Sequence, residues 1–144
     1  MQMTEARIGL TKVWFTGGLF FFFLIIVQSI LGAYGTDVDK AWGWALPTIM
    51  PTLLLIVGVL VGQQMNANPT KATVDPFLFR LTYWLSIFYL LVVNLTILLS
   101  PFTSRTKIEI MQTSNLFLGP LQGLVGAAFG AFFVARKDET PVSP

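Results

Sequence analysis

The chain has 144 residues, of which 54% are hydrophobic and only 11% are charged, whereas soluble domains carry about a quarter charged residues. This balance is typical of a membrane protein, and because the nine basic and seven acidic side chains nearly cancel, no basic face is left to bind nucleic acid. The absence of Cys and His excludes disulfides, thiol catalysis and the common zinc, haem and iron–sulfur ligands.

Charge-free runs recur four times along the chain, at 13–36, 41–70, 81–104 and 110–135. Each reaches the roughly 20 residues that a helix needs to cross a bilayer, and none alternates as a barrel strand would. We therefore predict an all-α integral membrane protein with four transmembrane helices, at about 13–35, 42–65, 78–100 and 111–135. The short links predict an antiparallel up-down bundle, with a cytoplasmic N-terminal segment (1–12) and a short polar tail (136–144).

One side of the first predicted helix carries mainly small residues and a single amide near mid-depth, at Gly17, Phe21, Gln28, Gly32 and Gly35. This pattern predicts an inward-facing seam. A cleaved signal peptide is the competing interpretation of the run. Its roughly 22 apolar residues exceed the usual hydrophobic region of such a peptide, and a good cleavage site is absent, so we expect the helix to be retained.

The second predicted helix contains two prolines, Pro47 and Pro51, on the same side as Gly58 and Gly62. Pro51 cannot donate a hydrogen bond to the carbonyl of Pro47, so we predict a kink between them. The freed carbonyl should be satisfied by a nearby threonine, another helix or a buried water. In a second interpretation Pro47 is the first helical residue, and only Pro51 kinks the helix.

Hydroxyl groups follow the third predicted helix at spacings of four and three. The positions are Thr82, Ser86, Tyr89, Val93, Thr96 and Ser100, and five of these six carry a hydroxyl. Helices in lipid associate through small residues and interhelical hydrogen bonds. This hydroxyl stripe is therefore predicted to be a packing seam.

Four glycines follow the fourth predicted helix at the same alternating spacing, at Gly119, Gly123, Gly126 and Gly130. Their bare backbone permits close approach, so we expect this glycine stripe to pack against the hydroxyl stripe of the third helix. The lipid-facing side is then expected to carry Phe117, Leu121, Leu124 and Phe132.

Basic residues near the helix ends predict the orientation. Six fall on the side of the N-terminus and three on the other: Arg7, Lys12, Lys71, Arg80, Arg136 and Lys137, against Lys40, Arg105 and Lys107. The positive-inside rule then puts both termini in the cytoplasm, and the expected location is a bacterial cytoplasmic membrane. The four tryptophans fall near predicted helix ends, as in an interfacial aromatic belt: Trp14, Trp42, Trp44 and Trp84.

Polar side chains at membrane depth are few. No acidic or basic residue lies well inside a predicted span, which disfavours a proton-coupled carrier. The polar side chains that remain are Gln28, Tyr89, Asn94, Thr96 and Gln122. They are candidates for lining a pore or a site for a neutral solute. The simpler interpretation is that each one bonds one helix to another.

Three carboxylates lie on the predicted outer face, at Asp37, Asp39 and Glu109. Together they could collect a divalent cation or form a hydrolytic site. Three basic residues in the same links balance their charge. A solvated loop surface is therefore the simpler interpretation.

The leading functional hypothesis is a non-enzymatic membrane protein that acts by helix–helix association, as a homo-oligomer or as the membrane subunit of a larger complex. The reason is that packing residues are abundant and catalytic groups are missing. The expected partners are the lipid bilayer and other membrane helices. We expect no cofactor and no metal. The first alternative is a small channel or pore-forming protein. The second is a membrane enzyme that uses the three outer carboxylates.

Overall fold

The computed structural model describes residues 2–65 and 74–134, which form four long α-helices and two short 3-10 helices. In chain order these are α1 (Met3–Ile30), η1 (Gly35–Asp37), α2 (Val38–Met65), α3 (Pro76–Leu98), η2 (Ser100–Phe102) and α4 (Lys107–Val134). All four α-helices are long and apolar enough to cross a membrane. The prediction of an all-helical chain with four membrane-length helices is confirmed.

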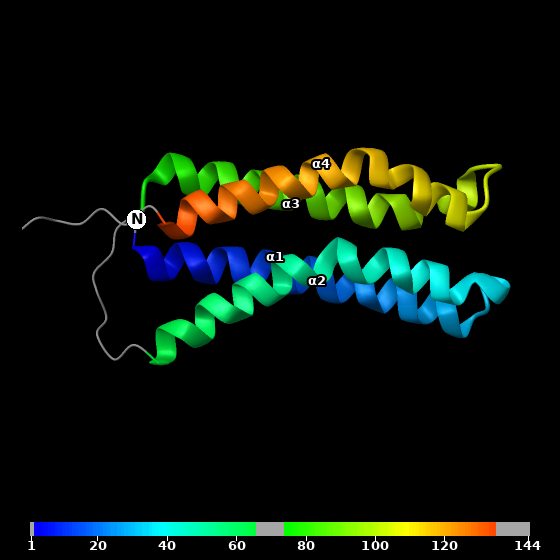
Figure 1. Ribbon diagram of the computed structural model, residues 1–144, viewed down its shortest axis with the longest axis horizontal. Helices are drawn as coiled ribbons and strands as arrows, with labels where there is room; N and C mark the ends of the chain where they lie inside the picture. Colours follow the sequence, from blue (N-terminus) through cyan, green and yellow to red (C-terminus); the bar gives the residue numbers. More distant parts are fainter. Residues whose placement is uncertain (1, 66–73, 135–144) are drawn as a thin grey trace, which may run out of the picture.

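The four α-helices lie lengthwise beside one another. In Figure 1, α1 and α2 lie on one side and α3 and α4 on the other, and the two links that contain η1 and η2 are at the end opposite the N-terminus. The main contacts join the helices in a ring, in the order α1, α3, α4, α2 and back to α1. Among the described residues, each helix therefore has two main neighbours and an outer side that faces away from the ring.

The first helix differs from the expected range at both ends. It begins at Met3, ten residues before the expected start, because residues 3–12 are helical although they include charged side chains. It ends at Ile30, and Gly32 and Gly35 have positive φ angles of 68° and 55°. Only glycine adopts that conformation without strain. These two glycines therefore form the turn into α2 and are not part of the inward seam predicted for the first helix.

Both prolines of the second helix lie inside it. Since α2 begins at Val38, Pro47 is not the first helical residue, and that interpretation was wrong. The C-terminal half of α2 slants away from the other helices in Figure 1. In agreement with this, α2 has no buried residue in 57–62, whereas Ile49, Thr52 and Ile56 are buried. The packed part of α2 thus includes both prolines and continues to Ile56, and the splayed part begins after Ile56.

Side chains of polar residues start the third and fourth helices. The Asp75 carboxylate accepts a hydrogen bond from the Phe77 N–H at 2.9 Å, and Pro76 occupies the first turn, where its missing donor costs nothing. Thr106 and Glu109 bond reciprocally, each side chain accepting from the other's backbone N–H. This capping box starts α4 at Lys107, four residues before the expected start.

The interior is aromatic and hydroxyl-rich, and the exterior is apolar. The largest fully buried side chains include Trp14, Tyr89, Phe21, Phe129 and Phe132. Buried polar residues are all threonine or serine: Thr48, Thr52, Thr82, Ser86, Ser100 and Ser114. Large apolar side chains such as Leu19, Phe23 and Leu116 are more than half exposed. An apolar exterior around a partly polar interior is the pattern expected of helices that pack in lipid.

Candidate functional site

Three helices meet at the proline pair of α2. Because Pro51 has no N–H, the carbonyl of Pro47 has no donor within its own helix. The Gln122 side chain of α4 donates to this carbonyl through Nε2, at 3.1 Å. The expectation that the Pro47 carbonyl would be satisfied is confirmed, with another helix as the donor. Gln122 therefore links α4 to the packed part of α2, at the proline pair.

The carbonyl of Thr48, the residue after Pro47 in α2, accepts a hydrogen bond from a side chain of α3. The fully buried Tyr89 donates its hydroxyl to the Thr48 carbonyl at 2.7 Å. One turn earlier, the Trp44 indole N–H donates to the Ser114 hydroxyl of α4 at 3.1 Å. Polar contacts with α3 and α4 thus hold the packed part of α2. Tyr89 and Gln122 are structural donors within the chain.

Trp14 lies at the centre of the aromatic interior. It is fully buried, its ring stacks on Tyr89 at 5.8 Å between centroids, and it meets the edge of Phe129 at 6.1 Å. Trp14 was predicted to lie near a helix end, but α1 begins at Met3, eleven residues earlier. Trp44 is also buried, whereas Trp84 is 66% exposed.

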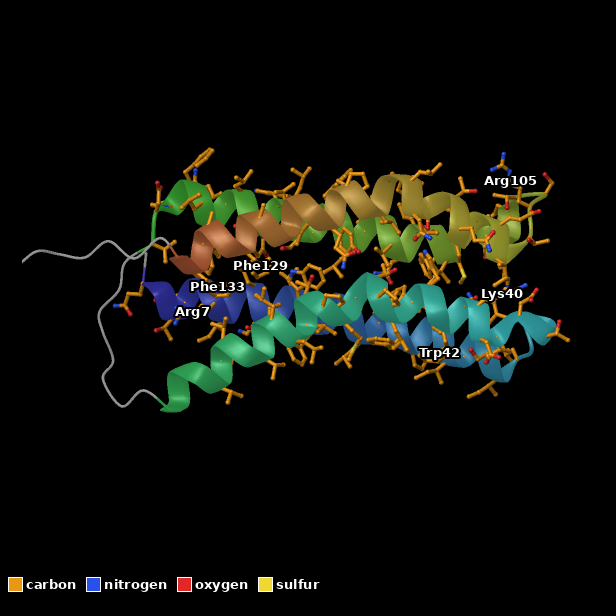
Figure 2. All side chains as sticks on the ribbon, viewed as in Figure 1. Arg7, Lys40, Trp42, Arg105, Phe129 and Phe133 are labelled. Atoms are coloured by element: carbon orange, nitrogen blue, oxygen red, sulfur yellow. The ribbon has the colours of Figure 1, made fainter. Side chains whose placement is uncertain are left out.

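A cationic side chain borders the same aromatic cluster. The Arg7 guanidinium of α1 lies 5.8 Å from the centroid of the Phe133 ring of α4. Figure 2 shows Arg7 beside Phe133 and Phe129, at the end of the molecule that carries the N-terminus. This cation–π contact adds a link between α1 and the C-terminal part of α4.

Gln28 has a role in fixing the turn between α1 and α2. Its Oε1 accepts a hydrogen bond from the Tyr34 hydroxyl at 2.8 Å, and the Trp42 indole N–H bonds the Ser29 hydroxyl at 3.2 Å. Burial raises the pKa of Tyr34 to about 12, so the phenol stays a neutral donor at physiological pH. These contacts fasten the start of α2 to the end of α1.

Asn94 and Thr96 bond mainly to their own helix. The Asn94 amide N–H donates to the Leu90 carbonyl at 2.7 Å, and the Thr96 hydroxyl donates to the Val92 carbonyl at 2.9 Å. Together with the contacts of Gln28, Tyr89 and Gln122, every polar residue proposed for pore lining bonds to another group of the chain. The described residues therefore favour the interpretation of these five as helix-packing groups.

The hydroxyl stripe of α3 is buried as predicted, except that Thr96 is partly exposed. Thr82, Ser86, Tyr89, Val93 and Ser100 are all buried. Most of its hydroxyls donate to carbonyls of α3 itself, such as Ser86 to Thr82 at 2.7 Å. Thr82 also lies 3.3 Å from the Ala128 carbonyl of α4.

Gly17 of α1 lies close to α3, because an added Cβ at Gly17 would be 2.8 Å from the Leu90 side chain. Gly17 is therefore an inward-facing contact of α1, as predicted.

The glycine stripe of α4 does not pack against α3, so that prediction was wrong. Gly119, Gly123, Gly126 and Gly130 are all exposed, and a Cβ added at any of them would meet no atom within 4 Å. The side of α4 that packs inward instead carries Leu118, Val125, Phe129 and Phe132. Large side chains fill the space between the helices of the ring, which leaves the glycines outside. Of the residues assigned to lipid, Phe132 is fully buried and Leu121 is half-buried, whereas Phe117 and Leu124 are exposed.

Two amides that the sequence interpretation missed extend the glycine stripe. Gln112 and Asn115 are exposed, and neither side chain takes part in a hydrogen bond of the described chain. At 100° per residue they fall within about 80° of arc with the four glycines. Their spacing of seven and four residues before Gly119 could have revealed them. The outer face of α4 thus combines bare backbone with unpaired amides.

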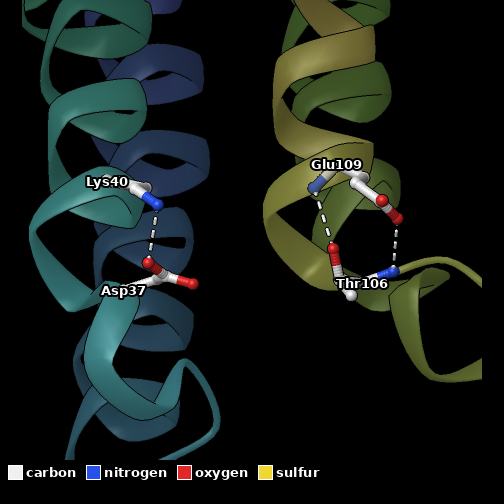
Figure 3. A network of polar contacts seen from close by, with 4 residues as sticks. All are labelled: Asp37, Lys40, Thr106 and Glu109. Atoms are coloured by element: carbon white, nitrogen blue, oxygen red, sulfur yellow. Dashed lines mark hydrogen bonds and ion pairs between the residues drawn. The ribbon is translucent and has the colours of Figure 1, made fainter.

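Two of the three acidic residues at the links, Asp37 and Glu109, form separate local pairs. Figure 3 shows the Asp37 carboxylate bonded to Lys40 and the Glu109 carboxylate bonded to the Thr106 N–H. The Asp37–Lys40 distance is 2.8 Å, and the Glu109–Thr106 distance is 3.0 Å. Within residues 2–65 and 74–134, no three His, Cys, Asp or Glu side chains come together as metal ligands. The local pairs leave the outer carboxylates without the shared geometry that a cation site would need.

The sequence matches no protein-family model, no curated protein and no solved structure. The functional argument therefore depends on the described geometry. The feature that the chain itself does not explain is the outer face of α4.

Proposed function

We propose that the protein is a non-enzymatic integral membrane protein that crosses a bacterial cytoplasmic membrane four times, as an antiparallel bundle, and acts by association with another membrane helix. The exposed glycine stripe of α4 supplies the contact surface. The single observation that carries this proposal is the position of four glycines on an outer helix face where no described residue beyond the local helix backbone and the two chain neighbours comes within 4 Å of an added Cβ.

The exterior of the bundle supports a membrane location. A helix of 28 residues is about 42 Å long, so α1, α2 and α4 each exceed the roughly 30 Å of bilayer hydrocarbon. Their outer sides carry leucine and phenylalanine, which would be costly to expose to water over such an area. The hydroxyl groups lie inside, where they bond to helix carbonyls.

The orientation is testable by reporter fusion. The basic count favours both termini and the α2–α3 link in the cytoplasm. Fusions at Pro144 and at Asp75 should report a cytoplasmic position, and a fusion at Asp39 an external one. The inverse pattern would reverse the orientation and leave the association proposal intact.

Glycine in an exposed helix face needs a physical reason. Each glycine in a helix interior costs about 1 kcal/mol relative to alanine, and the four of α4 stabilise no contact within the chain. In lipid, by contrast, bare backbone allows two helices to approach closely and gain dispersion contacts. The alternating spacing of four and three residues suits a left-handed crossing of about 20°.

The two amides on the same face support the same proposal. An amide that faces lipid has no hydrogen-bond partner, whereas an amide at a helix interface can bond to the facing helix. Gln112 and Asn115 lie one to two turns inside α4, in line with the glycines. A partner helix along this line would satisfy both amides and cover the bare backbone.

The mass of the purified protein in nanodiscs tests the association. Gly123→Leu and Gly126→Leu should each reduce the oligomer to a monomer, because a leucine on the stripe separates the two backbones. Gly43→Leu is the matched control, since Gly43 is also an exposed helical glycine with open space around it. If the wild type is oligomeric, equal masses for all three variants and the wild type would contradict the role of the stripe.

Cysteine cross-linking distinguishes a second copy from a different partner. The chain has no Cys, so Asn115→Cys or Gly123→Cys introduces one thiol. A homo-oligomer through α4 should form disulfide dimers at these positions in native membranes, and Leu124→Cys, 56% exposed on another side of α4, should not. A monomeric wild-type mass with no disulfide dimer would assign the stripe to a different membrane protein. Equal cross-linking at Leu124→Cys and Gly123→Cys would overturn the proposal.

A further inference from the structure

A groove of about 690 Å³ lies between the C-terminal half of α3 and the N-terminal half of α4. Its size is within the range of about 300–1,000 Å³ that bound ligands fill. The groove lies at the end of the molecule that holds the links, and it opens on a different side of α4 from the glycine stripe. A ligand there would leave the association surface free.

The wall of the groove along the helices is mainly apolar, and it also includes the hydroxyl residues Thr96 of α3 and Thr113 and Ser114 of α4. Its apolar side chains are Val92 and Leu95 of α3, Leu99 directly after α3, and Ile110 and Phe117 of α4. From Val92 to Leu99 the groove follows two turns of helix, a length of about 10 Å. This mainly apolar channel runs parallel to the helices and is long enough to hold part of a lipid acyl chain.

The mouth of the groove is polar and carries a positive charge. Thr103, Ser104 and Arg105 line it from the link before α4. Arg105 is exposed and forms no ion pair with any described residue. Figure 2 shows Arg105 extending from this link, at the same end of the molecule as Lys40. The position favours a negatively charged group at the mouth.

The other basic residues of this end are already engaged. Lys40 is paired with Asp37 at 2.8 Å, and the Lys107 ammonium lies 5.6 Å from the centroid of the Tyr34 ring. In addition, no hydrogen bond of the described chain uses the backbone N–H of Ser104 or of Arg105. One guanidinium and two amide donors are therefore available together in one link.

We propose that this groove binds an anionic phospholipid of the surrounding bilayer, with its phosphate at Arg105 and the Ser104–Arg105 amides and one acyl chain between α3 and α4. The inference rests on the proposed membrane location and is independent of the association through α4. Charge complementarity at the mouth and an apolar channel along the helix axis are together what a lipid with a negative head group requires. A soluble anion would leave the channel empty, and an uncharged lipid would leave Arg105 unpaired.

Native mass spectrometry of the full chain, released from detergent, tests the proposal. The probes are phosphatidylglycerol and phosphatidylcholine with identical acyl chains, added at equal concentration. The wild type should retain one phosphatidylglycerol in preference to phosphatidylcholine by about five-fold, which corresponds to the roughly 1 kcal/mol of one basic residue near an anionic lipid. Arg105→Gln should bring the two lipids to near parity.

Two further variants separate the groove from general surface charge. Lys40→Gln removes a positive charge at the same end of the molecule and should keep the wild-type preference, since Lys40 is neutralised by Asp37. Thr113→Phe places a bulky ring in the groove, at an exposed position that tolerates it, and should reduce retention of both lipids. Circular dichroism checks that each variant keeps its helices.

Three outcomes would overturn the inference. The first is equal retention of the two lipids by the wild type, and the second is an equal effect of Arg105→Gln and Lys40→Gln. The third is a Thr113→Phe variant that loses a dimer without losing lipid, which would assign the groove to a second copy of the chain. A protein that stays in solution without detergent would instead contradict the membrane location itself.

Discussion

The hydroxyl stripe of α3 and the glycine stripe of α4 have the same spacing but opposite positions in the molecule. The first is buried within the ring of helices, and the second is exposed along its whole length. The hydroxyl stripe carries Tyr89, whose ring fills space in the interior and whose hydroxyl reaches α2. The glycine stripe has no side chain that could fill such space.

This difference shows what a stripe of small residues means in a membrane protein. Its periodicity indicates that another backbone comes close on that side. Whether this backbone belongs to the same chain depends on which side of the helix has enough volume to fill the interior. In α4 the aromatic side, with Phe129 and Phe132, fills the interior, so the glycines remain outside, where we propose that a partner helix binds.

The largest expected effect is a separation of folding from assembly. Ser86→Leu inserts bulk at a fully buried position and should destabilise the fold by about 1–3 kcal/mol or more, as overpacking does in other cores. Gly126→Leu, in open space, should leave the unfolding temperature of the detergent-solubilised monomer nearly unchanged. Thermal unfolding followed by circular dichroism measures both.

The two variants also have a clear failure mode. If Gly126→Leu lowers the unfolding temperature of the monomer as much as Ser86→Leu does, the glycine stripe packs within the chain. The two stripes would then face each other, as the sequence alone suggested, and the surface proposed for association would not exist.

A second, smaller effect concerns the contact between Gln122 and the carbonyl of Pro47. Gln122→Leu should cost about 0.6–1.7 kcal/mol, the measured range for hydrogen bonds between membrane helices. In a Pro51→Ala background, residue 51 regains an N–H that can donate to Pro47 within α2. The cost of Gln122→Leu should then fall to near zero, so the two changes should couple in a double-mutant cycle.

Gln112→Leu is the control for this cycle, because Gln112 is an exposed amide of the same helix without a partner in the chain. It should have no effect on monomer stability in either background. Additive costs for Gln122→Leu and Pro51→Ala would mean that the bond does not compensate for the proline, and that Gln122 contributes only by packing.

The sequence was sufficient for the helices and for the pairing of α3 with α4, but not for the sides on which all the helices pack. Hydropathy predicted all four, because length and apolarity are local properties. The inward face of α3 was also predicted, since its hydroxyls are periodic. Its neighbour α4 was predicted as well, but the side of α4 that faces α3 was not, because that side depends on how the large side chains of all four helices fill one interior.

Two local errors have different physical causes. Gly32 and Gly35 fit the periodicity of a helix seam, but they form a turn with positive φ, and glycine is suited to both. The start of α4 was placed too late because the charged residues before 110 were taken as a link. The Thr-x-x-Glu spacing of Thr106 and Glu109 is the signature of a capping box and would have given the correct start.

The smallest expected effects distinguish the two links at the outer end. Thr106→Ala removes one acceptor of the capping box and should cost about 1 kcal/mol, the usual value for loss of an N-cap. Asp37→Asn breaks the Asp37–Lys40 pair, whose side chains are 42% and 62% exposed, and exposed ion pairs contribute little. The unfolding temperature should therefore fall for Thr106→Ala and remain almost constant for Asp37→Asn, at both low and high salt. If Asp37→Asn has the larger effect, the outer carboxylates interact beyond the local pairs of Figure 3, and a shared cation or catalytic site at this face would have to replace the association proposal as the explanation of these residues.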